Sequence, residues 1–313
     1  MATPPTPVSA TVAVAVLTYR REQAIVALLP ELARQARLVE PPAAVVVVDN
    51  DPEASARDRI TALGLPEVRY VHEPRPGIAA ARNAGMDAAG DVDLLVFIDD
   101  DETPSQRWLP LMLDAYRRLG GAAVAGRVIR SYEVEPEPWV RAARVFDRRQ
   151  MPTGTVVEAA STANLLLDMH VVRDLGLRFD DSLGISGGSD HLFTRQLSAS
   201  GHRIHWCDEA VVEDPVPASR LTSHWTLQRG YRSGNTSIIV DRLLAPTPGA
   251  RAKVRTRAAV GGAARVVAGG GRALVGMLTR SSDNRGKGMW TVVRGAGMVG
   301  GAIGHHYVEY RRG

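Results

Sequence analysis

The stretch LLVFIDDDE, residues 94–102, decides the fold class of this chain. A short apolar run, residues 94–98, is followed at once by four carboxylic acids, as expected for a buried strand that ends at a solvent-facing edge. In open α/β sheets, ligands bind outside the carboxyl ends of the strands. The stretch therefore predicts a central strand with an acidic binding edge.

Three earlier apolar runs repeat the same pattern. They are TVAVAVL at 11–17, AAVVVV at 43–48 and VRYV at 68–71, and each leads into a turn and then a helix-like stretch. Strands that are apolar on both faces need helices on both sides of the sheet. The alternation of strands and helices is typical of an α/β sheet protein.

Composition excludes several classes of protein. The 313 residues are 45% hydrophobic and 23% charged, which fits one large domain or two small ones and excludes a disordered or collagen-like chain. The single cysteine, Cys207, excludes an internal disulfide and a multi-cysteine zinc site. The first ten residues lack the pattern of a signal peptide, and no apolar run reaches the length of about 18 residues of a membrane span. We expect a cytoplasmic protein.

Charge divides the chain into two parts. Residues 1–240 carry 25 Lys and Arg against 31 Asp and Glu, whereas residues 241–313 carry 13 against 3. The same final part holds 15 of the 30 glycines. We expect a domain at 1–240 and a basic, Gly-rich helical segment at 241–313. Such a segment is suited to anionic lipid, nucleic acid or a phosphorylated substrate, or forms a solvated face without a partner.

Local signals predict further elements. Thr103 and Gln106 are spaced as a capping box, and Pro104 suits a first helical turn, so we expect a helix that begins just after Asp101. The irregular stretch 131–154 reads as a long surface loop or a lid. Later helices are expected at about 190–200 and at 223–240.

The acids after the fourth apolar run suggest their own chemistry. Asp99, Asp100 and Asp101 repel one another unless they are protonated or neutralised. A hard divalent cation neutralises them and still accepts phosphate oxygens. The cluster predicts a metal–diphosphate site; the alternative is an acidic turn that caps the next helix.

Other polar residues lie at the same expected edge. Asp49 follows the second apolar run and could accept hydrogen bonds from a ribose or a base, or belong to an Asx turn. Thr18 and Tyr19 follow the first run. Arg82 could contact a phosphate, or be a surface arginine. Asp190, after a Gly-rich stretch, is a candidate general base or a helix N-cap.

Taken together, LTYR, VVVVDNDP, HEPRPGIAAARNAG, FIDDDE and GGSD, in this order and at these intervals, resemble the family 2 inverting glycosyltransferases of GT-A fold. The resemblance covers roughly 12–240. EPRPGIAAARN, FIDDDE and GGSD are most similar to bacterial exopolysaccharide glucosyltransferases of the succinoglycan type. The implied fold is a Rossmann-like mixed sheet flanked by helices, with a nucleotide-sugar half at about 10–125, an acceptor half at about 126–240 and a C-terminal helical appendage.

The resemblance also implies roles for individual residues. The residues implied in nucleotide-sugar binding are Thr18, Tyr19, Asp49, Arg82 and Asp100. Asp101 would bind Mn²⁺ or Mg²⁺ at the diphosphate, with Asp99 sharing this duty. Asp190 would take the proton of the acceptor hydroxyl.

The chain departs from the family pattern at several places. Ser189 stands where an acid commonly precedes the base, and AVVEDPVP lacks a histidine, so that Glu213 is expected to substitute as an oxygen ligand. LQRGYRSG lacks the full signature of processive synthases, which favours addition of one sugar per encounter. Arg229 and Arg232 could hold the diphosphate or acceptor, or decorate an exposed helix.

The expected function is therefore inverting transfer of a sugar, glucose by resemblance, from a UDP-sugar to a saccharide acceptor. We expect the acceptor to be linked to a polyprenyl diphosphate, and the basic tail to make peripheral contact with the inner face of the cell membrane; no nucleic-acid partner is expected. The alternatives are a sugar nucleotidyltransferase and a non-catalytic nucleotide-sugar or polysaccharide-binding scaffold. No Gly-rich loop with a lysine follows the first apolar run, which weakens the nucleotidyltransferase alternative.

Overall fold

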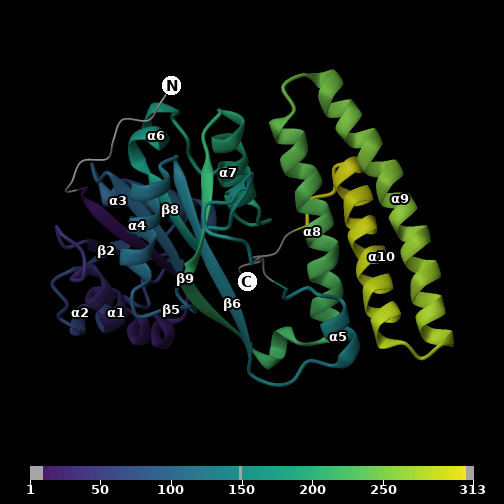
Figure 1. The fold of residues 1–313 in the computed structure, drawn as a ribbon, viewed down its shortest axis with the longest axis horizontal. Coiled ribbons are helices and arrows are strands. Elements are labelled where there is room, and N and C mark those ends of the chain that lie inside the picture. The colour runs from purple at the N-terminus through teal and green to yellow at the C-terminus, as the bar shows by residue number, and fades with distance from the viewer. Residues whose placement is uncertain (1–9, 148–149, 308–313) are drawn as a thin grey trace.

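The computed structural model describes residues 10–147 and 150–307, and within them a mixed sheet of nine strands carries helices on both faces (Figure 1). The strands are β1 (Val12–Thr18), β2 (Ala44–Asp49), β3 (Val68–His72), β4 (Leu94–Asp99), β5 (Thr103–Pro104), β6 (Ala123–Tyr132), β7 (Val156–Val157), β8 (Asn164–Asp168) and β9 (Ile204–Val216). The helices are α1 (Glu22–Ala36), α2 (Arg57–Ala62), α3 (Ile78–Ala89), α4 (Trp108–Leu119), α5 (Pro138–Ala142), α6 (Met169–Asp174), α7 (Ser189–Ala199), α8 (Ser223–Leu244), α9 (Pro248–Leu278) and α10 (Ser282–Ile303).

The sheet has the order β3-β2-β1-β4-β8-β6-β9-β5, and β7 pairs with β9. Strands β1 to β4 are parallel, whereas β8 runs antiparallel to both β4 and β6. The reversal at β8 pairs its first residue, Asn164, with Ile98, directly before the acidic stretch. The topology therefore brings the start of the second half of the sheet beside the acids of the first half.

The core lies on both faces of the sheet, as the apolar runs predict. On β1, Val14 and Val16 pack into the layer with α1 and α4, and Ala13 and Ala15 pack into the opposite layer with α3 and α7. All four side chains are fully buried. Because side chains alternate along a strand, a run that is apolar at every position fits only a sheet covered on both sides.

The helix expected just after Asp101 begins later, and this prediction was wrong at its start. Thr103 and Pro104 form β5 and pair with Glu213 and Val212 of β9, so the backbone at the expected cap is used by the sheet. Helix α4 starts at Trp108 without a side-chain cap. The pairing of β5 with β9 therefore takes precedence over the local preference of Thr103 to cap a helix.

The stretch 131–154 is only partly a loop, which corrects the prediction of a long loop or lid. Strand β6 continues to Tyr132, and Pro138–Ala142 form α5. Helix α5 packs against α10, since a Cβ on Gly286 would lie 2.3 Å from the carbonyl oxygen of Trp139. Positions 148 and 149 lie outside the described residues.

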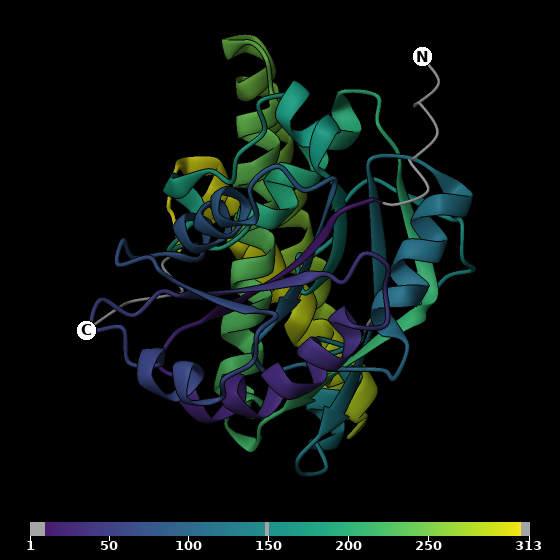
Figure 2. The same ribbon diagram turned by 90° about the vertical axis from the view of Figure 1, so that its left-hand side faces the viewer.

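The C-terminal segment is helical, as expected, and forms a three-helix layer with α8 (Figures 1 and 2). Helix α10 lies between α8 and α9 and contacts both. The contact is backbone to backbone: a Cβ on Gly234 would lie 2.0 Å from the carbonyl oxygen of Arg294. The expected boundary before Asp241 falls inside α8, which ends at Leu244.

Within the described part of the chain, none of the helices combines the length and hydrophobicity needed to cross a bilayer.

Candidate active site

Hydrogen bonds and ion pairs connect four side chains at the carboxyl ends of β1 and β4: Thr18, Arg21, Asp100 and Asp101. Thr18 Oγ1 donates a hydrogen bond to Asp100 Oδ2 over 2.8 Å. Arg21 Nη1 lies 2.8 Å from Asp100 Oδ1 and 2.7 Å from Asp101 Oδ2. The parallel register of β1 and β4 brings these residues together, because Leu17 pairs with Asp99. Arg21 partly neutralises the acids, and sequence reasoning did not identify it.

Three further acids, Asp99, Glu102 and Asp214, lie near this group. Burial raises the pKa of Asp99 to about 7 and the pKa of Glu102 well above its ordinary value, with neighbouring carboxylates adding to both shifts. Among the described residues, Glu102 Oε1 is buried and has no hydrogen-bond partner. Burial also raises the pKa of Asp214 on β9. This edge therefore concentrates carboxylates that the protein itself only partly neutralises.

Asp214, rather than Glu213, faces the acidic cluster, which corrects the expected ligand. Val212, Asp214 and Val216 are buried, whereas Glu213 is exposed. Side chains alternate across a strand, so neighbouring residues point to opposite faces. The alternation in the sequence VVEDPV was the signal that could have identified Asp214.

Arginines from three elements surround Asp101 and Asp214. Arg130 Nη1 of β6 lies 2.5 Å from Asp214 Oδ2, and Arg220 Nη2 lies 3.9 Å from Asp101 Oδ2. Arg229 of α8 is close enough for its charge to lower the pKa of Arg130, although burial is the larger cause. Arg229 was predicted from the sequence, whereas Arg130 and Arg220 were not. The guanidinium groups at this edge are suited to the oxygens of a phosphate.

Arg229 and Arg232 are one helical turn apart on α8. The guanidinium of Arg229 lies 5.9 Å from the centroid of the Trp225 ring. Arg232 is half-buried. The charge of Arg229 acts on Arg130, and the ligand-binding roles of Arg229 and Arg232 both stay predictions.

Asp49 is enclosed beneath the loop that follows β2. It is fully buried, and its carboxylate accepts hydrogen bonds from the backbone N–H groups of Asp51 and Ala56 and from the Tyr70 hydroxyl, each at 3.0 Å. Burial, followed by the charge of Asp49, raises the pKa of Tyr70 to about 12. Asp49 therefore holds the loop in shape, and its contact with a nucleoside stays a prediction. Tyr19 is half-buried at the end of β1.

Arg82 links the acidic edge to the predicted base. It is 5% exposed on α3, and its Nη1 donates a hydrogen bond to Ser189 Oγ over 2.8 Å. The charge of Arg82 lowers the pKa of Asp99, opposing the larger effect of burial. Ser189 is the first residue of α7 and precedes Asp190. Arg82 therefore contacts the helix that carries Asp190 and lies near enough to Asp99 for its charge to act on that carboxyl group.

Asp190 lies in the first turn of α7 and is not the N-cap, which is Gly188 in a left-handed conformation with φ 97°. A Cβ on Gly188 would lie 2.2 Å from Thr236 Cγ2 of α8, so only glycine fits there. Asp190 lines a cavity of about 320 Å³. The other lining residues come from β6, β8, β9 and the segments between them: Ala125, Gly126, Val128, Asp147, Val157, Ala159, Ala160, Ser161, Asn164, His191 and Trp206.

Helix α4 contacts one residue of the cavity wall, Asn164, through a hydrogen bond. Trp108 Nε1 donates a hydrogen bond to Asn164 Oδ1 over 2.8 Å, and Asn164 Nδ2 donates to the carbonyl oxygen of Ala210 over 2.8 Å. Asn164 pairs with Ile98, one residue before Asp99. The cavity with Asp190 therefore adjoins the acidic edge.

The carboxylates of this edge fit a hard divalent cation whose remaining ligands are oxygens of a bound phosphate. In the described residues, no group of three or more His, Cys, Asp or Glu side chains is arranged to hold a metal ion alone. Mg²⁺ commonly uses only one or two carboxylates together with substrate phosphates. Asp101, with Asp99 and the unpartnered oxygen of Glu102 behind it, offers oxygen ligands of this kind.

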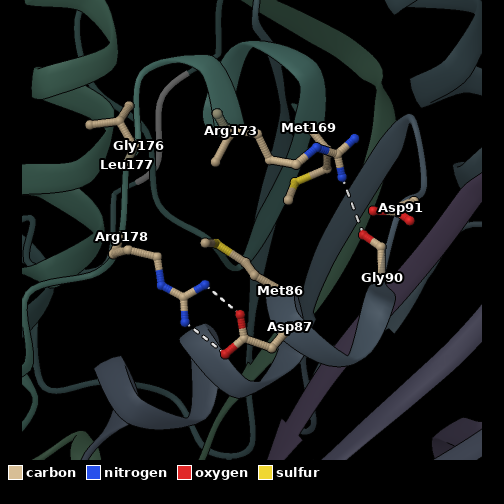
Figure 3. Close-up of a pocket in the computed structure, with 10 residues that line it drawn as sticks. Met86, Asp87, Gly90, Asp91, Met169, Arg173, Gly176, Leu177 and Arg178 are labelled. Atoms are coloured by element: carbon tan, nitrogen blue, oxygen red, sulfur yellow. Dashed lines mark hydrogen bonds and ion pairs between the residues drawn. The ribbon is translucent and has the colours of Figure 1, made fainter.

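A second cavity, of about 380 Å³, lies at the other end of the sheet (Figure 3). It adjoins Gly90 and Asp91, which precede β4. Arg178 pairs with Asp87 through contacts of 2.5 and 2.7 Å, and Arg173 donates to the Gly90 carbonyl (Figure 3). Its basic groups are occupied and it is not at the carboxyl ends of the strands, so the site with Asp190 is the better candidate.

Comparisons with known proteins identify the family and the fold. The profile of the family described as Glycosyl transferase family 2 matches residues 13–175. The succinoglycan biosynthesis protein ExoM of Rhizobium meliloti (strain 1021) is 37% identical over 242 residues, which cover 74% of each protein.

Two solved structures share the fold. The mannosyltransferase PcManGT from Pyrobaculum calidifontis, in complex with GDP-Man and Mn²⁺, has a TM-score of 0.57 at 16% identity, over 94% of this chain and 88% of that one. S. aureus TarS 1–349, in complex with UDP-GlcNAc, has a TM-score of 0.51 at 13% identity, over 90% of each chain. The family match and the identity to ExoM establish the relationship: the chain belongs to glycosyl transferase family 2 and is a glycosyltransferase of GT-A fold.

Proposed function

We propose that this glycosyltransferase moves one glucose residue from UDP-glucose to a hydroxyl group of a saccharide acceptor, with inversion, in the synthesis of an exopolysaccharide or a related surface glycan. The observation that carries the proposal is the hydrogen bond from Arg82, whose charge acts on Asp99 at the acidic edge, to Ser189, which directly precedes Asp190 at the wall of its cavity. The name of the relative ExoM supports the glycan class, and a neighbour bound to UDP-GlcNAc supports a UDP-sugar donor.

The donor would lie along the carboxyl ends of β1 and β4. Asp100, which accepts a hydrogen bond from Thr18, would also accept hydrogen bonds from the hydroxyl groups of a ribose. The guanidinium groups of Arg21, Arg130 and Arg220 lie at the same edge and are suited to the oxygens of a diphosphate. Tyr19 and the loop held by Asp49 would border the base.

Asp101, with a contribution from Asp99, would hold Mn²⁺ or Mg²⁺, and a neighbour bound to Mn²⁺ supports this assignment. When bound, the cation would neutralise charge on the diphosphate as it leaves. We assign the further oxygen ligand to Asp214 and not to Glu213, because the carboxylate of Asp214 is on the side of β9 that faces the acidic cluster.

Asp190 would act as the general base. Its position at the wall of the cavity leaves room for an acceptor saccharide, and a carboxylate that takes the proton of the attacking hydroxyl makes the oxygen a better nucleophile. A single displacement from the face opposite the leaving diphosphate inverts the anomeric carbon. One base and one leaving group suffice, so no covalent intermediate is needed.

The proposed acceptor is linked to a polyprenyl diphosphate, and the protein would then work at the inner face of the cell membrane. The chemical support is the excess of basic residues in 241–313. Arg229 and Arg232 on α8 are the residues proposed to meet the acceptor diphosphate.

The test begins with calorimetric binding of UDP, GDP and dTDP to the purified chain, with and without Mn²⁺. We expect binding of UDP that needs the metal and is lost in Asp101→Ala. Turnover of UDP-glucose with a lipid-linked saccharide extract then distinguishes a catalyst from a scaffold. Binding without turnover would support the scaffold alternative, and a preference for another nucleotide would overturn the proposed donor.

A further inference from the structure

Helix α9 buries small residues and exposes large apolar ones, the reverse of the usual arrangement of a helix on a water-soluble protein. Its buried residues are Ala258, Gly262, Gly269, Ala273 and Gly276. Its large apolar residues point outward: Val260 is 67% exposed, Val267 77%, Leu274 52% and Leu278 77%. The hydrophobic effect within the chain does not explain this orientation, because these side chains stay in solvent.

The inward face is packed too closely to accept larger side chains. A Cβ on Gly262 would lie 2.7 Å from the carbonyl oxygen of Gly295, and one on Gly269 would lie 2.8 Å from that of Gly288. These contacts seat α9 on α10 through backbone atoms. The orientation of α9 is therefore fixed, and its apolar side chains cannot turn inward by rotation of the helix.

The exposed apolar residues form one stripe. Val260, Val267 and Leu274 are spaced by seven residues and Leu278 follows four later, so all four lie on one side of the helix. Helix α9 forms the outer edge of the three-helix layer, with α10 between it and α8 (Figure 1). At about 1.5 Å per residue, the stripe from Val260 to Leu278 is about 27 Å long, which lets it lie along an extended surface.

The charge of α9 selects the kind of surface. The helix carries six basic residues and no acidic residue: Arg251, Lys253, Arg255, Arg257, Arg265 and Arg272. Lys253 and Arg257 are exposed two turns and one turn before Val260, respectively, and continue the same side of the helix. A second copy of α9 would bring its own basic residues against these, whereas an anionic bilayer surface attracts them.

We propose that the outer face of α9 docks on an anionic lipid bilayer, with Val260, Val267, Leu274 and Leu278 inserted at the headgroup boundary and Lys253 and Arg257 on the lipid headgroups. An amphipathic helix binds in this way when apolar insertion and basic charge act together. The inference rests on the proposed function for its biological purpose, since a lipid-linked acceptor lies in the same surface. Docking itself is independent of sugar transfer.

The experiment uses the full chain labelled with an environment-sensitive fluorophore at Val267→Cys. The natural Cys207 is buried and does not compete for the label. Vesicles of equal parts phosphatidylglycerol and phosphatidylcholine are compared with vesicles of phosphatidylcholine alone. We expect a blue shift with the anionic vesicles and little with the neutral ones. A matched label at Leu38→Cys, an exposed apolar site outside α9 that is 48% exposed, should show no shift.

Two unlabelled variants separate the contributions in vesicle flotation. Lys253→Gln with Arg257→Gln should lower partitioning by roughly 10- to 30-fold, since each basic side chain near an anionic surface contributes about fivefold. Replacement of Val260, Val267, Leu274 and Leu278 by Ser should reduce it at least as much, with Leu38→Ser as the control. Each variant should keep UDP binding, which shows that it is folded.

Equal flotation of the Ser variant and the parent chain would overturn the proposal. A blue shift without vesicles that grows with protein concentration would also overturn it, in favour of pairing between copies. Failure of UDP-glucose turnover with intact flotation would instead count against the proposed function alone.

Discussion

Arg82 on α3 donates a hydrogen bond to Ser189 at the start of α7 over 2.8 Å, and both side chains are buried. The bond joins the helix that follows β3 to the helix that carries Asp190. Serine carries no charge, so this bond does not neutralise Arg82. The charge of Arg82 lowers the pKa of Asp99, against the larger effect of burial.

Ser189→Ala should lower the free energy of unfolding by about 1 to 3 kcal/mol, because it leaves a buried guanidinium N–H without its partner. It should also lower kcat more than it raises KM for the donor, since α7 positions Asp190. Chemical denaturation and steady-state kinetics check both effects. Ser200→Ala, at the exposed end of α7, is the control and should change neither value.

Asp190→Asn should lower kcat by about 100- to 10,000-fold, the usual range for loss of a general base. The amide keeps the size of the side chain and the hydrogen bond that the backbone N–H of His191 donates to Oδ1 over 2.8 Å. UDP affinity with Mn²⁺ should therefore stay within about twofold in calorimetry. Full activity of this variant would rule out Asp190 as the base.

Arg21→Ala should strengthen binding of Mn²⁺ to the nucleotide-free protein by about two- to fivefold, because a partly exposed ion pair contributes about 0.5 to 1 kcal/mol. Arg21 contacts both Asp100 and Asp101 and so competes with a cation for them. Electron paramagnetic resonance of free Mn²⁺ measures the change. Arg20→Ala, whose side chain pairs with Asp51 instead, should leave Mn²⁺ affinity unaltered; weaker binding in Arg21→Ala would contradict competition.

Tyr70→Phe should reduce the loss of stability at high pH. The pKa of Tyr70 rises from about 10 to about 12 on folding, so the native state holds this proton more tightly than the unfolded chain. The stabilisation is complete below pH 10 and is lost as the pH rises through 12. Thermal unfolding of the parent protein and the variant between pH 8 and pH 12 measures the difference in their stability. This difference should become smaller towards pH 12, and a difference that stays constant would exclude the linkage.

Much of the first half of the fold could be predicted from local sequence. The runs at 11–17 and 94–98 are apolar at every position or nearly so, and this pattern allows few structures other than strands covered on both faces. The acids that follow at 99–102 then lie at the binding edge because parallel strands end together. The family resemblance rested on the same motifs and is confirmed by the family match.

The site residues that were missed depend on contacts between distant elements. Arg21, Arg130 and Arg220 meet acids of other strands only after β1, β4, β6 and β9 have assembled, and nothing in their local sequence separates them from surface arginines. Asp214, and not the predicted Glu213, faces the acids because the position of β9 in the sheet decides which side of the strand faces them.

The sequence by itself determined that the apolar runs form strands, and it determined the acidic edge, the helical nature of the tail and the family. Only the tertiary structure decided where α4 begins, which acid of β9 joins the cluster and which side of α9 faces solvent. The physical reason is the range of the interactions. The spacing of apolar side chains and the composition describe a single element. The pairing of Thr103 with Glu213 and the contact of Gly262 with Gly295 instead join different elements, which meet only in the folded chain.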